Sequence, residues 1–141
     1  MDDPYNLQRF VAAQAPVFEQ VCTELRAGSK QTHWMWFIFP QIAGLGRSAT
    51  ARRFAISSPE EAGAYLQHPL LGARLRECAR LVNRIDGRSI SAIFGYPDDL
   101  KFHSSMTLFA RVASDNAVFE EALGKYFGGQ GDPATLGKLW T

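Results

Sequence analysis

The chain has 141 residues, of which 46% are apolar and 21% are charged, and its formal net charge is +1. A chain of this length and apolar content buries a core of its own, so disorder is excluded and a single globular domain over residues 1–141 is expected. The near balance of charge excludes a protein that binds nucleic acid or a membrane surface through a large basic surplus. Any site for a charged ligand must therefore be formed by a local cluster of charged residues.

No export signal, membrane segment or metal motif is found in the sequence. Cys22 and Cys78 are too few for a disulfide framework and lack metal-binding spacing, so both are expected to be buried thiols of a reduced protein. The N-terminus is acidic where a signal peptide is basic, and the longest apolar run, residues 34–39, is too short to cross a bilayer. The histidines have neither HxxxH nor HExxH spacing. We expect a cytoplasmic protein without a metal, a cofactor or a membrane partner.

Apolar residues recur at helical spacing over most of the chain, which predicts an all-α fold. The first helix covers residues 5–26, where Pro16 is expected to kink or split it near Ala15. Ser58 and Pro59 are typical of a capped helix start. Further helices are predicted over residues 48–55, 58–67, 70–85, 97–113, 118–127 and 132–140, the last ending near Trp140, and residues 89–94 are expected to form a short turn or helix. The expected architecture is a compact, mainly helical domain of about six to seven helices.

Residues 33–39 are the candidate for a short strand or extended segment. Six apolar residues follow His33 without polar alternation, so this segment needs cover on both sides. A single strand has no partner with which to form a sheet. The segment is therefore either one turn of buried helix or a short strand whose partner the sequence does not identify.

Local charge indicates an anion site in the first half of the chain. No acidic residue lies between Glu24 and Glu60, whereas Lys30 and Arg47 lie inside this stretch. A region with basic residues and no acidic ones attracts anions even when the whole chain is nearly neutral.

A glycine-containing loop lies in the same stretch and precedes the predicted helix at 48–55. Gly44 and Gly46 leave backbone amides free to converge, and Arg47 and Ser48 lead into a helix N-terminus whose dipole attracts anions. The spacing matches neither a Walker loop nor a dinucleotide fingerprint. We expect this loop to hold phosphate or carboxylate, and the alternative is a plain tight turn.

Two tryptophans lie close to polar residues near the start of the same stretch. Trp34 is a candidate for stacking on a planar ligand whose charge Lys30 or His33 would meet. Core packing is the favoured expectation for Trp36, with stacking on a ligand as its alternative, and core packing is also the alternative for Trp34. The alternative for His33 is a hydrogen-bonded structural role.

The predicted helix at 97–113 is largely apolar but carries a set of polar side chains that includes Asp99 and Lys101. Polar groups that enter a core either tie helices together or line a cavity. Asp99 is a candidate general base if burial raises its pKa, and His33 is the second candidate catalytic residue. Asp98 and Asp99 also suit the positive end of the helix dipole, which is the structural alternative.

The chain resembles domain-of-unknown-function family 1810, an uncharacterised family of small bacterial proteins sometimes labelled calpastatin. The resemblance spans nearly the whole chain and rests on Gly28-Ser29-Lys30, His33 to Gln41, Gly44 to Ser48, Tyr65-Leu66, His68-Pro69, Leu71-Gly72, Asp99-Leu100-Lys101, Ser104 to Phe109, Asp132 and Thr135-Leu136. It implies a compact helical domain without an established activity. A fainter similarity, in the composition of residues 30–36 and 99–101, is to the ADP-ribose-associated glycosidase family, and no catalytic assignment follows from it.

Two functions are consistent with these residues. The first is a small-molecule site for a phosphorylated or nucleotide-like ligand, in which residues 44–48 and Lys101 help to bind the ligand. Glycosidic hydrolysis is its candidate reaction, with Asp99 as the base. The second is a non-catalytic binding or adaptor module, in which Arg76, Arg80 and Arg84 on one helix face meet a protein or RNA partner. Nucleic acid is the less favoured partner because the chain is nearly neutral.

Overall fold

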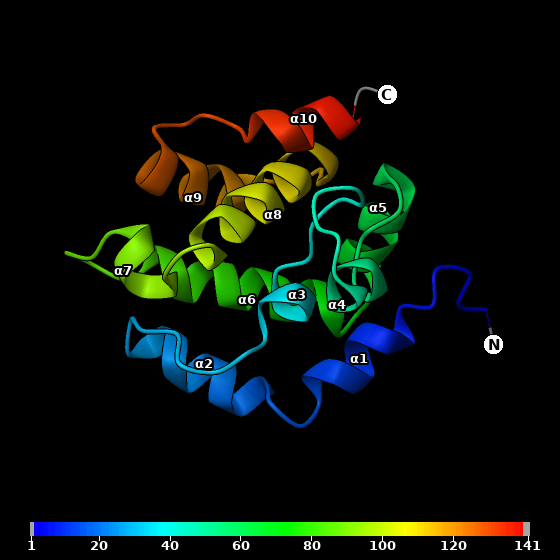
Figure 1. Ribbon diagram of the computed structural model, residues 1–141, viewed down its shortest axis with the longest axis horizontal. Coiled ribbons are helices and arrows are strands. Elements are labelled where there is room, and N and C mark those ends of the chain that lie inside the picture. Colours follow the sequence, from blue (N-terminus) through cyan, green and yellow to red (C-terminus); the bar gives the residue numbers. More distant parts are fainter. Residues whose placement is uncertain (1, 140–141) are drawn as a thin grey trace.

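A computed structural model describes residues 2–139, and these form ten helices (Figure 1). In chain order they are α1 (Gln8–Gln14), α2 (Phe18–Arg26), α3 (Met35–Ile38), α4 (Ala49–Arg53), α5 (Pro59–Gln67), α6 (Leu71–Asn83), α7 (Ile90–Phe94), α8 (Asp98–Val112), α9 (Ala117–Phe127) and α10 (Pro133–Leu139). The prediction of a compact all-α domain is confirmed. The helices are more numerous than expected because the first predicted helix is divided and the shortest segments are helical as well.

The helix boundaries lie where local sequence signals predict them. The helix expected over residues 5–26 is split at Pro16 into α1 and α2, because proline interrupts the hydrogen bonds of a helix. The Ser58 hydroxyl caps α5 by accepting a hydrogen bond from the Glu61 amide at 3.1 Å. The expected end of the last helix near Trp140 lies outside the described residues.

The segment 33–39 contains α3, a single helical turn. Ile38 on this turn is buried and Trp36 is half-buried, so one face of the turn packs in the core and another is partly exposed, as in an amphipathic helix. The possible strand is therefore contradicted, and the alternative of one helical turn is correct. Among residues 2–139 the one β-bridge is isolated, between Ile42 and Ile56, and it closes the loop that contains α4.

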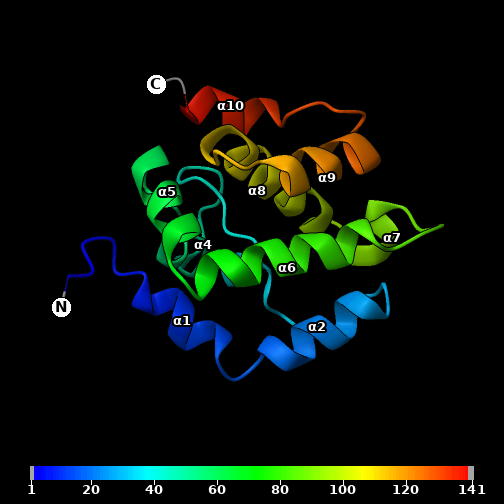
Figure 2. The ribbon, with the colours of Figure 1, turned by 180° about the vertical axis from the view of Figure 1, so that it is seen from behind.

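The helices lie in three tiers, which Figures 1 and 2 show from opposite sides. α1 and α2 lie at one edge, α6 crosses the middle, and α8, α9 and α10 lie at the other edge. α8, which corresponds to the largely apolar helix expected at 97–113, is central to the core, because Phe102, Met106 and Phe109 on it are fully buried. α3 contacts both α6 and α8, so the loops beside α3 meet the start of α8. No helix among the described residues is long and apolar enough to cross a membrane.

The two cysteines lie in the contact between α2 and α6. Cys22 and Cys78 are both buried and form no disulfide, as predicted. A hydrogen bond with Cys78 lowers the pKa of Cys22 to about 7, against the opposing effect of burial.

The contact between α5 and α6 depends on a glycine. A methyl group at Gly72 would lie 2.0 Å from the backbone oxygen of Leu66. Gly72→Ala should therefore lower the free energy of unfolding by at least about 2 kcal/mol, measured by urea denaturation. Gly124→Ala on α9 is the control, because no atom lies within 4 Å of its added methyl group. We expect the control to raise stability by about 0.5–1 kcal/mol, and equal effects of the two substitutions would contradict the close approach of α5 to α6.

Candidate functional site

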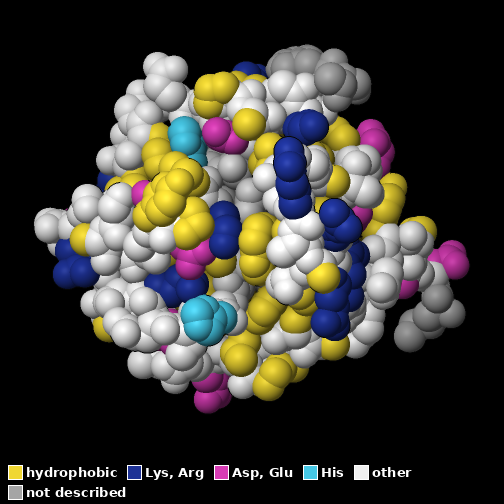
Figure 3. Space-filling view, in the orientation of Figure 1, with side chains coloured by type: hydrophobic (Ala, Val, Ile, Leu, Met, Phe, Trp, Pro, Cys, Tyr) yellow, Lys and Arg dark blue, Asp and Glu magenta, His cyan; other side chains and the backbone are white. Residues whose placement is uncertain are grey.

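Three neighbouring cavities share the side chain of Trp36 as a wall. Their volumes are about 140, 230 and 300 Å³, and they lie among the loop before α3, the loop at 41–46 and the first half of α8. Figure 3 shows basic, acidic and histidine side chains next to one another near the middle of the face that contains α3 and the start of α8. The cavities are therefore lined by both aromatic and charged groups.

A buried carboxylate on α2 fixes the loop that leads into α3. Glu24 Oε1 accepts hydrogen bonds from the amides of Gln31 and Thr32, at 2.7 and 3.0 Å, and from the indole Nε1 of Trp34 at 3.0 Å. Its other oxygen accepts from the Thr32 hydroxyl at 2.6 Å. Burial alone would raise the pKa of Glu24, but these hydrogen bonds outweigh burial and lower the pKa to about 2. The carboxylate therefore stays ionised and holds the loop in one position.

This loop brings Lys30 to the start of α8, where it shares a carboxylate with Lys101. Lys30 Nζ lies 2.8 Å from Asp98 Oδ2, and Lys101 Nζ lies 3.0 Å from Asp98 Oδ1. The Lys30 side chain is only 7% exposed. The Lys101 ammonium also lies 4.1 Å from the centre of the Trp36 ring. Two cations against one anion leave this partly buried cluster with a net positive charge.

The charge of Asp98 depends on its two partners. Burial favours the neutral carboxyl, but the hydrogen bonds and charges of Lys30 and Lys101 outweigh burial and hold the pKa of Asp98 below its ordinary value. Asp98 is therefore ionised at neutral pH and is a poor proton donor there.

Gln41 contributes an unpaired donor to the two larger cavities. Its side chain lines both of them and is 8% exposed, and its Nε2 is buried without a hydrogen-bond partner among the described residues. A buried donor without a partner costs about 1–3 kcal/mol. The Gln41 amide is therefore available to an acceptor atom that enters either cavity.

The polar side chains at the far wall of the largest cavity are held by the protein itself. The His103 ring stacks on Phe127 with ring centres 3.9 Å apart, and its Nε2 lies 2.8 Å from the Gln130 carbonyl oxygen. Asp132 accepts hydrogen bonds from the amide and the hydroxyl of Thr135, at 3.1 and 2.6 Å, and so caps α10. No group of three or more His, Cys, Asp or Glu side chains among residues 2–139 is placed to hold a metal ion.

Most of the residues selected from the sequence line these cavities. The smallest cavity is lined by four of them, Lys30, His33, Trp34 and Lys101, and the 230 Å³ cavity is lined by Gly44 and Gly46. A methyl group at Gly46 would lie 3.1 Å from the Trp36 ring, so the loop at 41–46 packs closely on that ring. The structure thus brings together residues 30–36 and the glycine-containing loop, which the sequence analysis identified separately as candidate ligand-binding segments.

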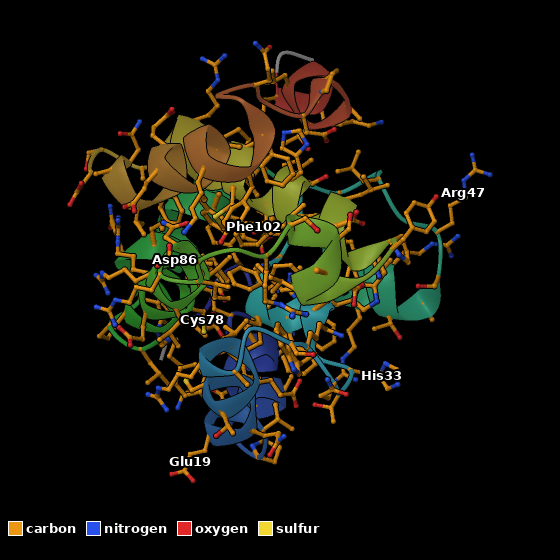
Figure 4. The ribbon with its side chains drawn as sticks, turned by 90° about the vertical axis from the view of Figure 1, so that its left-hand side faces the viewer. Glu19, His33, Arg47, Cys78, Asp86 and Phe102 are labelled. Carbon is orange, nitrogen blue, oxygen red and sulfur yellow. The ribbon has the colours of Figure 1, made fainter. Side chains whose placement is uncertain are left out.

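Three of the selected residues lie outside the cavities. Asp99 accepts a hydrogen bond from the Ser91 hydroxyl at 2.9 Å and so ties α7 to α8. Ser48 caps α4 by accepting from the Ala51 amide at 3.0 Å. Arg47 is exposed and, in Figure 4, extends away from the body of the molecule. The carboxylate that faces the site is Asp98, because successive side chains on a helix point about 100° apart.

The two tryptophans both line the smallest cavity but differ in burial. Trp34 is 1% exposed and packs against Phe39 and Phe94, whereas Trp36 lines all three cavities. Glu24 and Gln41 were not among the residues selected from the sequence. Asp98 was assigned only a dipole role, although its spacing of three residues from Lys101 is a signal for an ion pair.

Comparison with known proteins agrees with the resemblance seen in the sequence. The chain matches the family model DUF1810, a protein of unknown function, over residues 4–139. The chain belongs to the DUF1810 family. It is similar to the crystal structure of the conserved hypothetical protein Rv1873 from Mycobacterium tuberculosis, with 60% identity, 99% of each chain covered and a TM-score of 0.97. A comparison with curated proteins finds no match.

The Glu24 carboxylate yields a prediction for this DUF1810 protein. Glu24→Gln should lower the free energy of unfolding at pH 7 by about 2 kcal/mol, because charge-assisted hydrogen bonds to buried donors are lost. Its pKa is about 2 in the folded protein and 4.5 ordinarily. The stabilisation is therefore complete above about pH 4.5 and is lost as the pH falls toward 2.

Urea denaturation at pH 7 and at pH 3 measures this effect. The difference between wild type and Glu24→Gln should be smaller at pH 3. Glu19→Gln is the matched control, because Glu19 is exposed on the same helix (Figure 4). A loss of stability in Glu19→Gln as large as that in Glu24→Gln would contradict the role of the buried carboxylate.

Proposed function

We propose that the protein binds a small phosphorylated, nucleotide-like ligand in the cavities around Trp36. The observation that carries this proposal is the pairing of Lys30 and Lys101 with the single carboxylate of Asp98. Removing an unbalanced charge from water is unfavourable unless an opposite charge compensates it. An anionic group on a ligand supplies that compensation, and a phosphate accepts hydrogen bonds from both ammonium groups.

The remaining walls support a ligand that also has a ring. Trp36 offers an apolar surface on which a base or a sugar packs, and Lys101 lies over the same ring. The Gln41 Nε2 is free to donate to a ring oxygen or nitrogen. The largest of the three cavities around Trp36, of about 300 Å³, lies at the lower end of the range for small-molecule sites, about 300–1,000 Å³.

The same contacts favour binding over glycosidic hydrolysis. Hydrolysis of a glycosidic bond ordinarily uses two carboxyl groups, one of which donates a proton. Asp98 is held ionised by two lysines, and Asp132 already accepts hydrogen bonds from Ser104 and Thr135. We therefore propose a binding function, and analysis of ligands for released base after incubation tests the catalytic alternative.

Thermal unfolding with a panel of ligands tests the proposal. The panel contains nucleoside monophosphates, nucleoside diphosphate sugars and ribose 5-phosphate at millimolar concentration. A ligand present at ~100 times its Kd stabilises the folded state by about 2.7 kcal/mol and should raise Tm by several degrees. Lys101→Gln and Trp36→Leu should each lose most of this shift, because they remove the anion partner and the stacking surface.

Arg47→Gln is the control for these variants. It also removes one positive charge, but Arg47 is exposed and lines none of the three cavities. Its ligand-induced shift should equal that of wild type. The proposal is overturned if no member of the panel changes Tm, or if Arg47→Gln loses as much of the shift as Lys101→Gln.

Gln41 gives a separate prediction in which stability and binding change in opposite directions. Gln41→Met replaces a buried unpaired donor by an apolar side chain of similar shape, so it should stabilise the ligand-free protein by about 1 kcal/mol. The same variant should weaken the binding of a ligand that accepts from Gln41. Urea denaturation without ligand and titration with the ligand selected from the panel measure the two effects. A loss of stability in the ligand-free variant would contradict the assignment of an unpaired donor.

A further inference from the structure

A second basic groove lies apart from Trp36, where the ends of α2 and α6 meet the loop into α7. Its volume is about 490 Å³, and three arginines line it, Arg26, Arg84 and Arg88. None of its lining residues is shared with the cavities around Trp36. Figure 4 shows Asp86, which also lines the groove, on the side of the molecule opposite Arg47.

We propose that this groove binds the phosphate groups of a polyphosphorylated small molecule. The inference does not depend on the function proposed for the Trp36 cavities. It rests on three guanidinium groups that gather in one concave place without an acidic partner.

The guanidinium groups are free to bind. The guanidinium groups of Arg26 and Arg84 have neither a carboxylate nor a hydrogen-bond partner among residues 2–139. Arg88 donates one hydrogen bond, from Nη2 to the Ala92 oxygen at 3.0 Å. The other N–H groups of its guanidinium remain available. The arginine fork matches the oxygens of a phosphate group, and each such contact is charge-assisted.

The arginines are not needed to complete the helix ends. At the end of α2, the amides of Ala27, Gly28 and Ser29 donate to the last carbonyls. At the end of α6, Lys125 Nζ donates to the carbonyls of Asn83 and Ile85, both at 2.6 Å. These groups satisfy the carbonyls that a helix end leaves without a partner. The three guanidinium groups therefore have no capping role that explains their position.

The one acidic residue in the lining does not neutralise the groove. Asp86 is 97% exposed, and its carboxylate lies 3.5 Å from Lys125 Nζ rather than beside an arginine. Like charges held in one groove repel one another, and a multiply charged anion relieves this repulsion. No aromatic side chain lines the groove, so there is no platform for a base and the phosphates are the groups recognised.

The basic helix face suggested by the sequence is thereby reduced to one of its members. Arg76 donates to the Asp115 oxygen at 2.8 Å and lies over Phe119, and Arg80 pairs with a carboxylate on its own helix. Arg84 alone of the three reaches the groove. The proposed phosphate site therefore uses only the end of this face, where Arg84 joins Arg26 and Arg88.

Isothermal titration of the full chain with inorganic pyrophosphate tests the proposal. The titration is repeated in the Lys101→Gln background, so that binding near Trp36 does not contribute. Arg26→Gln and Arg84→Gln should each weaken pyrophosphate binding about tenfold, because each removes charge-assisted hydrogen bonds. Both residues are exposed, and unchanged melting temperatures without ligand show that the variants fold. Arg47→Gln, which removes the same charge on another side of the molecule, should bind as tightly as its parent.

The alternatives give different results. Absence of pyrophosphate binding at millimolar concentration overturns the proposal, and so does equal weakening by Arg47→Gln. Loss of binding in Lys101→Gln, with no effect of Arg84→Gln, places the phosphate in the Trp36 cavities and also overturns it. A single-stranded RNA that binds through Arg26 and Arg84 while pyrophosphate does not would replace the small molecule by a nucleic-acid backbone. None of these outcomes overturns the function proposed for the Trp36 cavities, which the ligand panel tests. The two proposals can therefore fail separately.

Discussion

The site around Trp36 depends on the buried carboxylate of Glu24. This carboxylate forms no ion pair with a lysine or arginine in the described part of the chain, residues 2–139, and is stabilised by hydrogen bonds from the loop that follows α2. A buried charge is tolerated when enough donors surround it, and the same donors are then fixed in place. The loop before α3 therefore has little freedom, although it has no regular secondary structure until α3 begins.

The fixed loop transmits this constraint to the start of α8. The backbone amide of Lys30 donates to the Ile93 oxygen at 2.8 Å, and its side chain reaches Asp98. One residue thus links the loop to α7 and α8 together. The opposite wall of the cavities is held less firmly, by the isolated bridge between Ile42 and Ile56 and by the contact of Gly46 with the Trp36 ring. The loop at 41–46 is therefore the less constrained wall of these cavities.

The sequence predicts the helices well because their signals are local, as at Pro16 and Ser58. It predicts the site only in part, because rotation of side chains about a helix is decided by packing. The two tryptophans illustrate this limit. On a strand, Trp34 and Trp36 would share a face. Instead Trp34 lies just before α3 and is buried, whereas Trp36 lies on its single turn, is half-buried and lines all three cavities. The same limit separates Asp98 from Asp99, which are adjacent in sequence and differ only in the direction they face.

The near-neutral net charge of +1 conceals an uneven distribution of charged side chains between the interior and the surface. Glu24, Glu61 and Asp99 are buried, and Glu24 and Asp99 form no ion pair with a lysine or arginine among residues 2–139. Buried carboxylates bound by internal donors contribute less to the field outside than exposed arginines do. The surface is therefore more positive than the composition suggests. The guanidinium groups of Arg26 and Arg84 are part of this positive surface and have no carboxylate partner among residues 2–139. The positive field at the surface arises because carboxylates that could balance these arginines are bound inside the fold instead.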